Sequence, residues 1–456
     1  MRVELEAPLT LSEICASASI TLDAEKSKLI KAISLDTRLL QANDLFIALN
    51  GENGSGEDHI QEALKKGCPV ISCTNLPGVM HADNTKEALL EIASFYKARA
   101  NIKDTVAVTG SVGKSTTVSF LRKILGSCRR VHSPLGNFNN HIGVPLTLLA
   151  MPNSTDVLVT ELGMNHSGEI SRLSRCVRPN IGIITAVGTA HIGNLGSRSE
   201  IARAKLEILD GMSGGTLLLP KDEALLQNIT DALYIGCNST IADISLDKVT
   251  GDTYKLRSPL GDIDGIRFFD NREHLIHNLA FAISASQLIG LTDDEIIHGV
   301  ETINDRDLRQ RFITLGDFTI FDDSYNASLE SVTADLRFIS MLNRPTGAFL
   351  GDILELGELA SDIHERIGNE AGSLGIGRLY LYGKYAEATA KGAIDRGMRP
   401  DDIFINPDLS SPEISVNQIK QHHKHGEIIL FKASHKLRLD KIADLIKKEE
   451  TENEWQ

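Results

Sequence analysis

The sequence lacks an excess of basic residues. It contains 47 Lys and Arg against 61 Asp and Glu, a formal net charge of −14, and no segment concentrates positive charge. Proteins that bind DNA or RNA neutralise phosphates with clustered Lys and Arg, so nucleic acid is not an expected partner. An anionic ligand must instead be held by a local set of donors, because the field of the whole protein does not attract it.

Long apolar runs and paired cysteines are also absent. No apolar stretch reaches the ~18 residues that a membrane span needs, and the first residues, MRVELEAPLTLSEICAS, do not resemble a signal peptide. The six cysteines include no CxxC pair, which argues against a disulfide framework and against a thiolate metal site. We therefore expect a cytoplasmic protein that does not span a membrane.

The length and the pattern of apolar segments predict three domains. At roughly 150 residues per domain, 456 residues correspond to about three, and 42% hydrophobic with 24% charged residues is typical of α/β proteins. We expect a small α/β domain at 1–98, a central parallel sheet with a phosphate loop at 99–312, and a doubly wound, dinucleotide-binding-like domain at 313–456.

Short apolar runs separated by helical patterns predict the strands of these domains. The expected strands are Leu45–Leu49, Pro69–Ser72, Thr105–Thr109, Val157–Thr160, Ile181–Val187, Thr216–Leu219, Phe318–Phe321, Gly347–Leu350, Leu379–Tyr382, Ile403–Ile405 and Ile428–Phe431.

The segment Thr109–Thr116 has the composition of a phosphate-binding loop. It joins a strand to a helix, so backbone N–H groups and the helix N-terminus converge on one point, where anions bind. Gly110 and Gly113 allow close backbone approach, Lys114 can reach the β- and γ-phosphates, and Ser115 can coordinate Mg²⁺. The loop is the short form G-x-x-G-K-S-T, with Val108 in place of the first glycine of the general motif. A turn that merely caps a helix is the alternative interpretation.

Two polar residues follow neighbouring strands of the central domain. Glu161 ends the expected strand Val157–Thr160, and His191 follows Ile181–Val187. The carboxyl ends of parallel strands meet at one edge of a sheet, so both side chains are expected beside the phosphate loop, where a carboxylate can bind Mg²⁺. The alternatives are a helix-capping acid and an ordinary loop histidine.

Lys205 lies in the middle of an apolar stripe. At ~100° per residue, its helix face carries Ile201, Ala202, Leu206, Ile208 and Leu209. One interpretation is a lysine that extends past the core to solvent. The other is a desolvated, neutral amine that reacts with CO₂ to give an anionic carbamate facing the metal site.

Several motifs, in this order, resemble the Mur ligase family over nearly the whole chain. They are TGSVGKSTT, GNFNNHIGVPLTLL, ELGMNHSGEI, GTAHIGNLGS, AKLEI, DDSYNAS and LGDILELGE. The short phosphate loop is this family's own form. The resemblance implies an ATP-dependent peptide ligase of peptidoglycan synthesis, in which a carboxylate takes the γ-phosphoryl group and an amine then displaces phosphate.

The resemblance also implies the roles of individual residues. Lys114, Lys205 and His191 would be catalytic. Ser115 and Glu161 would hold one Mg²⁺, and His191 with carbamylated Lys205 would hold a second. The residues expected to contact ATP are Gly110, Ser111, Gly113, Lys114, Ser115, Thr116, Asn278, Arg309 and Asp323.

YNA and LGDILELGE resemble the family member that adds a dipeptide. This resemblance implies UDP-MurNAc-tripeptide and D-Ala-D-Ala as substrates, and we expect the protein to be a monomer. The residues expected to contact these substrates are Thr37, Arg38, Asn137, Asn139, Asn140, Tyr325 and Asn326. The alternatives are the related ligase that adds a third amino acid to UDP-MurNAc-dipeptide and a non-catalytic nucleotide-binding homologue. His141 and His435 depart from the family's pattern.

Overall fold

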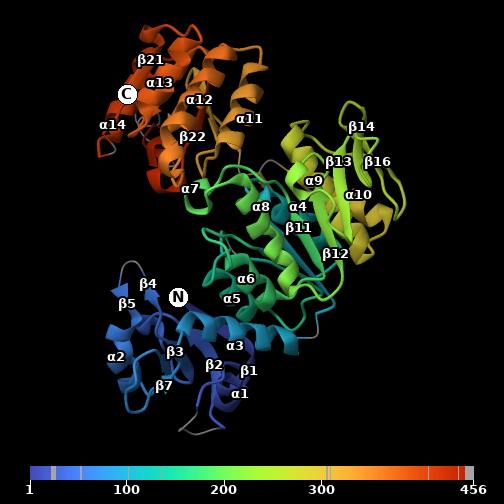
Figure 1. The fold of residues 1–456 in the computed structure, drawn as a ribbon, viewed down its shortest axis with the longest axis vertical. Coiled ribbons are helices and arrows are strands. Elements are labelled where there is room, and N and C mark those ends of the chain that lie inside the picture. Colours follow the sequence, from blue (N-terminus) through green and yellow to red (C-terminus); the bar gives the residue numbers. More distant parts are fainter. Residues whose placement is uncertain are drawn as a thin grey trace.

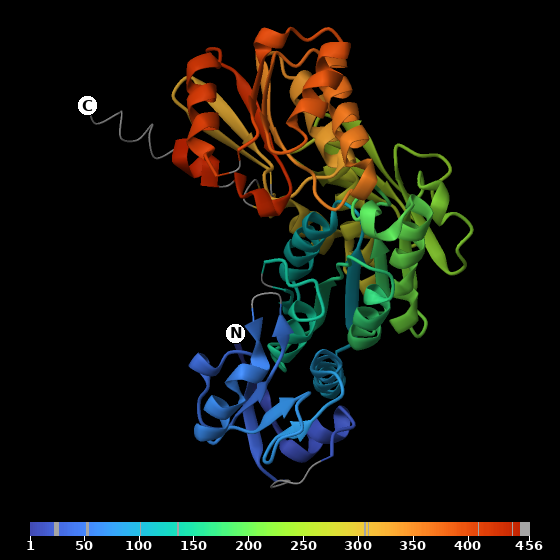
Figure 2. The same ribbon diagram turned by 60° about the vertical axis from the view of Figure 1, so that its left-hand side comes forward.

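The chain forms three α/β domains in a row. The computed structural model describes residues 1–21, 27–51, 54–100, 102–134, 136–304, 307–308, 310–408, 410–439 and 441–446. Figures 1 and 2 show the N-terminal and C-terminal domains at opposite ends of the long axis, with the central domain between them. The predicted fold class is confirmed by three separate sheets that alternate with helices.

The N-terminal domain is built on a five-stranded sheet of order β1-β2-β3-β6-β7, in which only β1 and β2 are antiparallel. Its strands are β1 (Arg2–Thr10), β2 (Leu29–Ser34), β3 (Asp44–Ile47), β6 (Val70–Ser72) and β7 (Met80–His81), and its helices are α1 (Leu11–Ser17), α2 (Ile60–Lys65) and α3 (Thr85–Arg99). A short ribbon, β4 (Asn50–Gly51) and β5 (Gly54–Ser55), lies outside the sheet.

The central domain is built on a nine-stranded sheet of order β16-β15-β14-β13-β12-β11-β8-β10-β9. Its strands are β8 (Asp104–Thr109), β9 (Val131–His132), β10 (Val157–Glu161), β11 (Ile181–Ile184), β12 (Thr216–Pro220), β13 (Ala232–Cys237), β14 (Ile244–Thr250), β15 (Thr253–Arg257) and β16 (Ile263–Arg267). Its helices are α4 (Lys114–Gly126), α5 (Gly143–Leu149), α6 (Glu169–Val177), α7 (Ile192–Leu195), α8 (Arg198–Leu206), α9 (Glu273–Ile289) and α10 (Asp293–Glu301).

The strand order of the central sheet brings the predicted site residues to one edge. Strand β8 lies between β10 and β11 and is parallel to both. The register pairs Val108 with Glu161 on one side and Thr109 with Ile184 on the other. The segments that follow these three strands therefore leave the sheet side by side, at the point where parallel α/β sheets bind ligands.

The C-terminal domain is doubly wound, as expected. Its strands are β17 (Arg311–Leu315), β18 (Phe318–Asp322), β19 (Thr346–Gly351), β20 (Arg378–Tyr382), β21 (Ile403–Asn406) and β22 (Ile428–Lys432), in the order β17-β18-β22-β19-β20-β21. Only β17 is antiparallel to its neighbour. Helices α11 (Leu329–Ser340), α12 (Ala360–Ser373) and α13 (Ala386–Asp395) share one buried cluster, and α14 (Pro412–His422) belongs to another.

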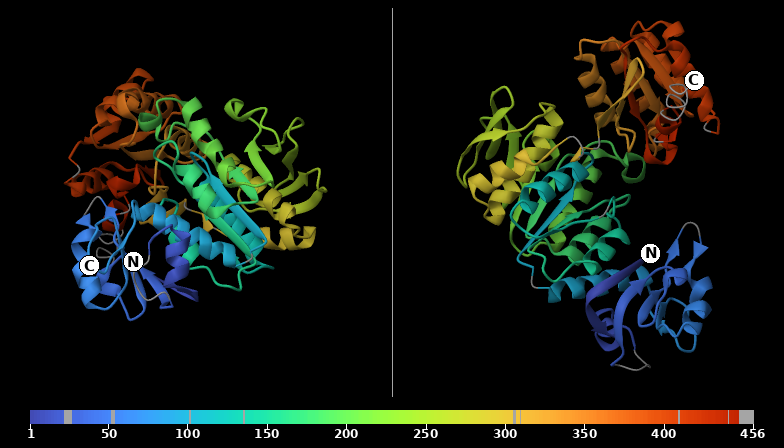
Figure 3. Two further views of the ribbon diagram at one scale, coloured as in Figure 1. Left: turned by 60° about the horizontal axis from the view of Figure 1, so that its bottom comes forward. Right: turned by 180° about the vertical axis from the view of Figure 1, so that it is seen from behind.

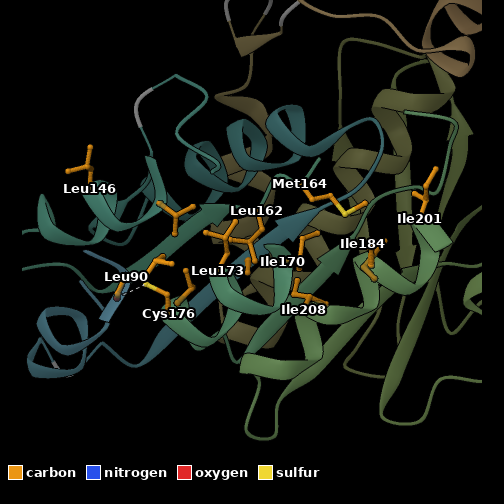
Figure 4. Close-up of a cluster of buried hydrophobic side chains, with 14 of the residues drawn as sticks. Leu90, Leu146, Leu162, Met164, Ile170, Leu173, Cys176, Ile184, Ile201 and Ile208 are labelled. Atoms are coloured by element: carbon orange, nitrogen blue, oxygen red, sulfur yellow. Dashed lines mark hydrogen bonds between the residues drawn. The ribbon is translucent and has the colours of Figure 1, made fainter. Parts of the chain in front are cut away.

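The N-terminal and central domains share an apolar core. Helix α3 packs against α5 and α6, and Figure 4 shows Leu90 of α3 beside Cys176 and Leu173 of α6. The Cys176 thiol donates a hydrogen bond to the Leu90 carbonyl at 3.2 Å. The C-terminal domain contacts the central domain at α7, a junction that can be followed from behind in Figure 3.

Three features depart from the sequence-based expectations. Strand β11 ends at Ile184, three residues early, and β17 crosses the predicted boundary between residues 312 and 313. The strands β13–β16, which extend the central sheet, were not predicted. In β14–β16 polar residues interrupt the apolar ones, whereas β13 (ALYIGC) is a short apolar run. Among the described residues, no helix combines the length and the apolar character of a membrane span.

Candidate active site

A cavity of about 1160 Å³ lies where the central and C-terminal domains meet. Its walls contain the whole phosphate loop, together with Glu161, His191 and Lys205 of the central domain. The C-terminal domain contributes Asp323 and Lys432. The structure therefore brings the predicted catalytic residues and the predicted metal ligands to one site.

The phosphate loop has the backbone geometry that anion binding requires. Gly113 has φ +85° and precedes the first residue of α4, so the positive end of this 13-residue helix faces the cavity. A Cβ atom at Gly113 would lie 2.4 Å from Oδ1 of Asn278, and one at Gly110 would lie 1.9 Å from Oγ1 of Thr185. The Lys114 amine donates a hydrogen bond to the Gly110 carbonyl at 2.6 Å, so the lysine side chain folds back over its own loop.

Ser115 and Glu161 are in direct contact, although they come from different elements. The Ser115 hydroxyl donates to the Glu161 carboxylate at 2.5 Å, and the Asn139 amide donates to its other oxygen at 2.8 Å. Glu161 is only 4% exposed, and α6 begins after Gly168, so Glu161 is not a helix cap. A buried carboxylate beside a hydroxyl is a set of hard oxygen donors, which suits Mg²⁺.

Lys205 is buried at the edge of the cavity. It is 1% exposed, so its side chain does not extend to solvent, and its amine forms no ion pair within the described part of the chain. Burial, together with the positive charge of Lys114, lowers the pKa of Lys205 well below its usual value. The amine is therefore held toward its neutral, nucleophilic form.

His191 joins the two domains. It has the left-handed φ of +65° and directly precedes α7, and its Nδ1 lies 2.5 Å from a carboxylate oxygen of Glu355 in the C-terminal domain. Glu355 follows β19, in the segment LGDILELGE. This pairing was not predicted from the sequence.

A buried charge cluster lies on the C-terminal side of the cavity. The Lys432 amine bonds to Asp323 and lies 2.9 Å from Asp335, while the Gln310 amide donates to both carboxylates. Burial disfavours the Asp323 carboxylate, but the charge of Lys432 together with hydrogen bonds from Asp335, Lys432 and Gln310 outweighs it and holds the Asp323 pKa below its usual value. Burial raises the pKa of Asp335 to about 8, with Asp323 acting in the same direction. The two carboxylates overcome the effect of burial on Lys432 and raise its pKa to about 12.

The cluster contains two residues without a role in the sequence analysis, Asp335 and Lys432. Lys432 begins the segment KASH at the end of β22, and its position at a strand end was the available signal. Asp335 lies inside α11 and carried no signal, because its partner is 97 residues away along the chain.

The residues predicted to contact the nucleotide lie in different surroundings. Asn278 is buried against Gly113 and accepts a hydrogen bond from the Thr117 hydroxyl at 3.3 Å. Ser111 is tied to the neighbouring loop, since its hydroxyl accepts from the Gly188 N–H at 2.8 Å. Arg309 lies outside the described residues.

The predicted substrate contacts divide into two groups. Asn137, Asn139, Tyr325 and Asn326 line the cavity, and the ring of His435 lies 4.9 Å from that of Tyr325. Asn140 does not line it; its amide oxygen accepts from the N–H groups of residues 142 and 143 at the start of α5.

Thr37 and Arg38 are in the N-terminal domain, on a short 3₁₀ turn apart from the cavity. The Thr37 hydroxyl donates to Glu62 at 2.6 Å. Arg38 is 84% exposed and pairs with Asp36, so its guanidinium group is accessible to an anion.

The fold and the loop define a phosphate-loop protein with three α/β domains, and comparisons with known proteins identify the family. Residues 108–267 match the Mur ligase middle domain. The chain is 34% identical to the UDP-N-acetylmuramoyl-tripeptide–D-alanyl-D-alanine ligase of Bacillus subtilis, over 91% of this chain and 93% of the relative. It is 31% identical to the Synechocystis ligase of the same name, over 91% of each chain. This chain belongs to the Mur ligase family.

Solved structures agree with this assignment at the level of the fold. A MurF crystal structure from Acinetobacter baumannii matches with a TM-score of 0.86 at 24% identity, over 98% of this chain and 100% of that one. MurF ligase from Thermotoga maritima, in complex with ADP, matches with a TM-score of 0.77 at 23% identity, over 92% of this chain and 98% of that one.

Proposed function

We propose that this chain is an ATP-dependent ligase that joins D-alanyl-D-alanine to UDP-N-acetylmuramoyl-tripeptide in peptidoglycan precursor synthesis. The names of its relatives in Bacillus subtilis and Synechocystis support the choice of substrates. The observation that carries the proposal is the convergence of Lys114, the Ser115–Glu161 pair and Lys205 on one cavity that the C-terminal domain closes on its other side. The Thermotoga MurF complex with ADP supports ATP as the nucleotide.

The reaction consists of two displacements. A carboxylate oxygen of the tripeptide attacks the γ-phosphorus of ATP, ADP leaves, and an acyl phosphate forms. The amine of D-Ala-D-Ala then attacks the acyl carbon, loses a proton, and releases inorganic phosphate. Lys114 and the N–H groups at the start of α4 would neutralise the charge on the transferring phosphoryl group, since phosphoryl transfer depends mainly on positioning and electrostatic stabilisation.

The proposed metal ligands fit Mg²⁺. Ser115 and Glu161 would hold one ion, because both are oxygen donors in contact at the phosphate end of the cavity. His191 and carbamylated Lys205 would hold the second. When bound, Mg²⁺ would neutralise charge on the phosphate oxygens.

The carbamate proposal depends on the environment of Lys205. A neutral amine adds to CO₂ and loses one proton, which replaces a costly buried ammonium by an anion that can face a cation. Burial and the absence of an ion pair among the described residues favour this reaction. Carbon-13 NMR of the protein with labelled bicarbonate, ADP and Mg²⁺ should show a carbamate signal that Lys205→Ala lacks. No difference between the two spectra would refute the carbamate.

The substrates would extend over all three domains. We propose that Thr37 and Arg38 contact the UDP group, with Arg38 on the diphosphate, and that Asn137 and Asn139 contact the peptide. Tyr325 and Asn326 would contact D-Ala-D-Ala on the C-terminal side. A cytoplasmic location and a monomeric state stay predictions.

An acceptor comparison tests the function. The purified protein is incubated with ATP, Mg²⁺ and UDP-MurNAc-tripeptide, together with D-Ala-D-Ala or a single amino acid, and products are identified by mass. We expect the pentapeptide product only with D-Ala-D-Ala, together with ADP and phosphate. A parallel reaction replaces the tripeptide substrate by UDP-MurNAc-dipeptide. Product from UDP-MurNAc-dipeptide and one amino acid would favour the related ligase, and no turnover in any reaction would favour a non-catalytic homologue.

A further inference from the structure

The loop that carries His191 is held by two acidic side chains of the C-terminal domain. Glu330, at the start of α11, accepts hydrogen bonds from the N–H of Thr189 at 2.8 Å and from its hydroxyl at 3.2 Å. Glu355 contacts the His191 ring at 2.5 Å. Figure 1 shows α7 at this junction, next to the C-terminal domain.

The backbones of the two loops fit closely together. The Gly193 N–H donates to the Glu355 carbonyl at 3.0 Å. A Cβ atom at Gly193 would lie 2.5 Å from the nitrogen of Gly357 and 2.6 Å from the Glu355 carbonyl oxygen. Glu355 itself has a φ of +64°, a left-handed conformation that is strained for a residue other than glycine. This strained conformation, together with the close contact, directs the Glu355 side chain at His191.

The chemistry of this pair determines which ring nitrogen carries a proton. The Glu355 carboxylate oxygen lies 2.5 Å from Nδ1 of His191, and an ionised carboxylate can only accept a hydrogen bond. In this contact Nδ1 of His191 is therefore the donor, and in the tautomer with its hydrogen on Nδ1 the lone pair lies on Nε2. Carboxylates that fix histidines in this way orient the ring and make its other nitrogen a better ligand.

We propose that Glu355 is a positioning residue that fixes the tautomer and ring orientation of His191, and that it does so only when the C-terminal domain is docked. The site would then become competent through docking of residues 353–357 onto residues 188–193. The effect on turnover rests on the proposed ligase function, whereas the effect on the His191 ring does not.

Two variants of different kinds test the proposal by kinetics. Glu355→Ala removes the carboxylate, and Gly193→Ala separates the loops without changing any charge. Both should lower kcat about 10- to 100-fold, the usual effect of losing such a partner, with a smaller change in the KM for ATP. Glu355→Gln keeps an acceptor and should retain part of the activity. Glu358→Ala, an exposed acid three residues further on, is the matched control and should be unaffected.

Nitrogen-15 NMR of histidine-labelled protein provides a readout that does not depend on turnover, with the His191 signals assigned by a His191→Asn variant. The wild type should show a protonated Nδ1, and Glu355→Ala should lose this preference while Glu358→Ala keeps it. An unchanged His191 spectrum in Glu355→Ala would overturn the proposal. A changed spectrum in a protein without ligase activity would support the positioning role while refuting the proposed function.

Discussion

At the scale of single residues, the central feature is a charge-bearing side chain kept where water cannot reach it. Lys205 is buried without an acidic partner among the described residues, whereas the equally buried Lys432 contacts two carboxyl groups. The two lysines therefore shift in opposite directions: the pKa of Lys205 falls well below its usual value and that of Lys432 rises to about 12. We infer that Lys205 acts as a reactive, nucleophilic amine, whereas Lys432 has a structural role and holds the Asp323 and Asp335 side chains together.

Lys205 should make stability depend on pH. Its pKa is lower in the folded chain than the value of about 10.4 in the unfolded chain, so between these two values the unfolded chain binds more protons. Stability should therefore rise with pH, by up to about 1.4 kcal/mol per pH unit for this one group. Urea unfolding without bicarbonate, at pH 7 and pH 9.5, measures this slope. Lys205→Met should reduce the slope and abolish turnover; an equal slope in both proteins would contradict the prediction.

Lys114 should be required for phosphoryl transfer. Its amine lies at the phosphate loop, where it can neutralise charge that develops on the γ-phosphate. Lys114→Ala should lower kcat for phosphate release by about 10²–10³-fold, comparable to the removal of other groups that stabilise a transition state. Arg122→Ala, on the exposed face of the same helix, serves as the control. Full ATP turnover by Lys114→Ala would refute the assignment of the loop.

At the scale of elements, the junction of β8 and α4 depends on a glycine in the left-handed conformation. Gly113→Ala places a methyl group 2.4 Å from Asn278 at φ +85°, so the loop or α9 must shift. We expect nucleotide affinity to fall at least about 10-fold, since 1.4 kcal/mol of strain is sufficient. Calorimetric titration with ADP and Mg²⁺ measures the change.

The other end of α4 provides the control for this substitution. Gly126 ends the helix, and a Cβ atom there meets nothing within 4 Å. Gly126→Ala should leave ADP affinity unchanged. Equal losses in the two variants would show that helix stability, rather than the loop geometry, accounts for the effect.

The ends of β18 and β22 and the middle of α11 are joined by the Asp323–Lys432–Asp335 cluster. Lys432→Met would leave two carboxylates buried together, which should destabilise the protein by about 3–5 kcal/mol. The exposed pair of Lys391 with Glu365 is the matched control, and Lys391→Met should cost at most about 1 kcal/mol. Urea unfolding of both variants provides the comparison, and similar losses would contradict a special role for burial.

An element or a site residue could be predicted from the sequence when the residues that define it are close together along the chain. Strands with continuous apolar runs, such as β8, β10 and β22, were predicted within a residue or two because burial on both faces leaves a simple pattern. The strands β1 and β14–β16 mix polar and apolar residues and were missed, and β2, β7, β9, β13 and β17 were missed as well. Lys205 was recognised because a charged residue on the apolar face of a single helix is visible in the local sequence. Glu355, Asp335 and Lys432 were not assigned roles, because each acts on a residue of a distant segment.

At the scale of the whole molecule, the active-site cavity lies between two domains. Its residues come from the phosphate loop on one side and from Asp323, Tyr325 and Lys432 on the other, so its width depends on how these domains are placed. Substrates that contact both sides should favour a closer arrangement, since ligands stabilise the state in which they make more contacts.

Small-angle scattering should detect this closure. We expect the radius of gyration to decrease when a non-hydrolysable ATP analogue and UDP-MurNAc-tripeptide are added together. Gly193→Ala, which prevents close contact of the two loops, should show a smaller decrease. An unchanged scattering curve for the wild type with both ligands would contradict domain closure.

The shared core of the N-terminal and central domains has a consequence for substrate choice. Because α3 packs against α5 and α6, Arg38 and Lys114 are held in parts of the chain whose separation is fixed by this interface. A substrate anchored at Arg38 by its diphosphate could present its carboxylate to Lys114 only if the peptide between them had the right number of residues. The interface would then select substrates by the length of their peptide. A peptide one residue shorter would fail to react even when ATP is bound.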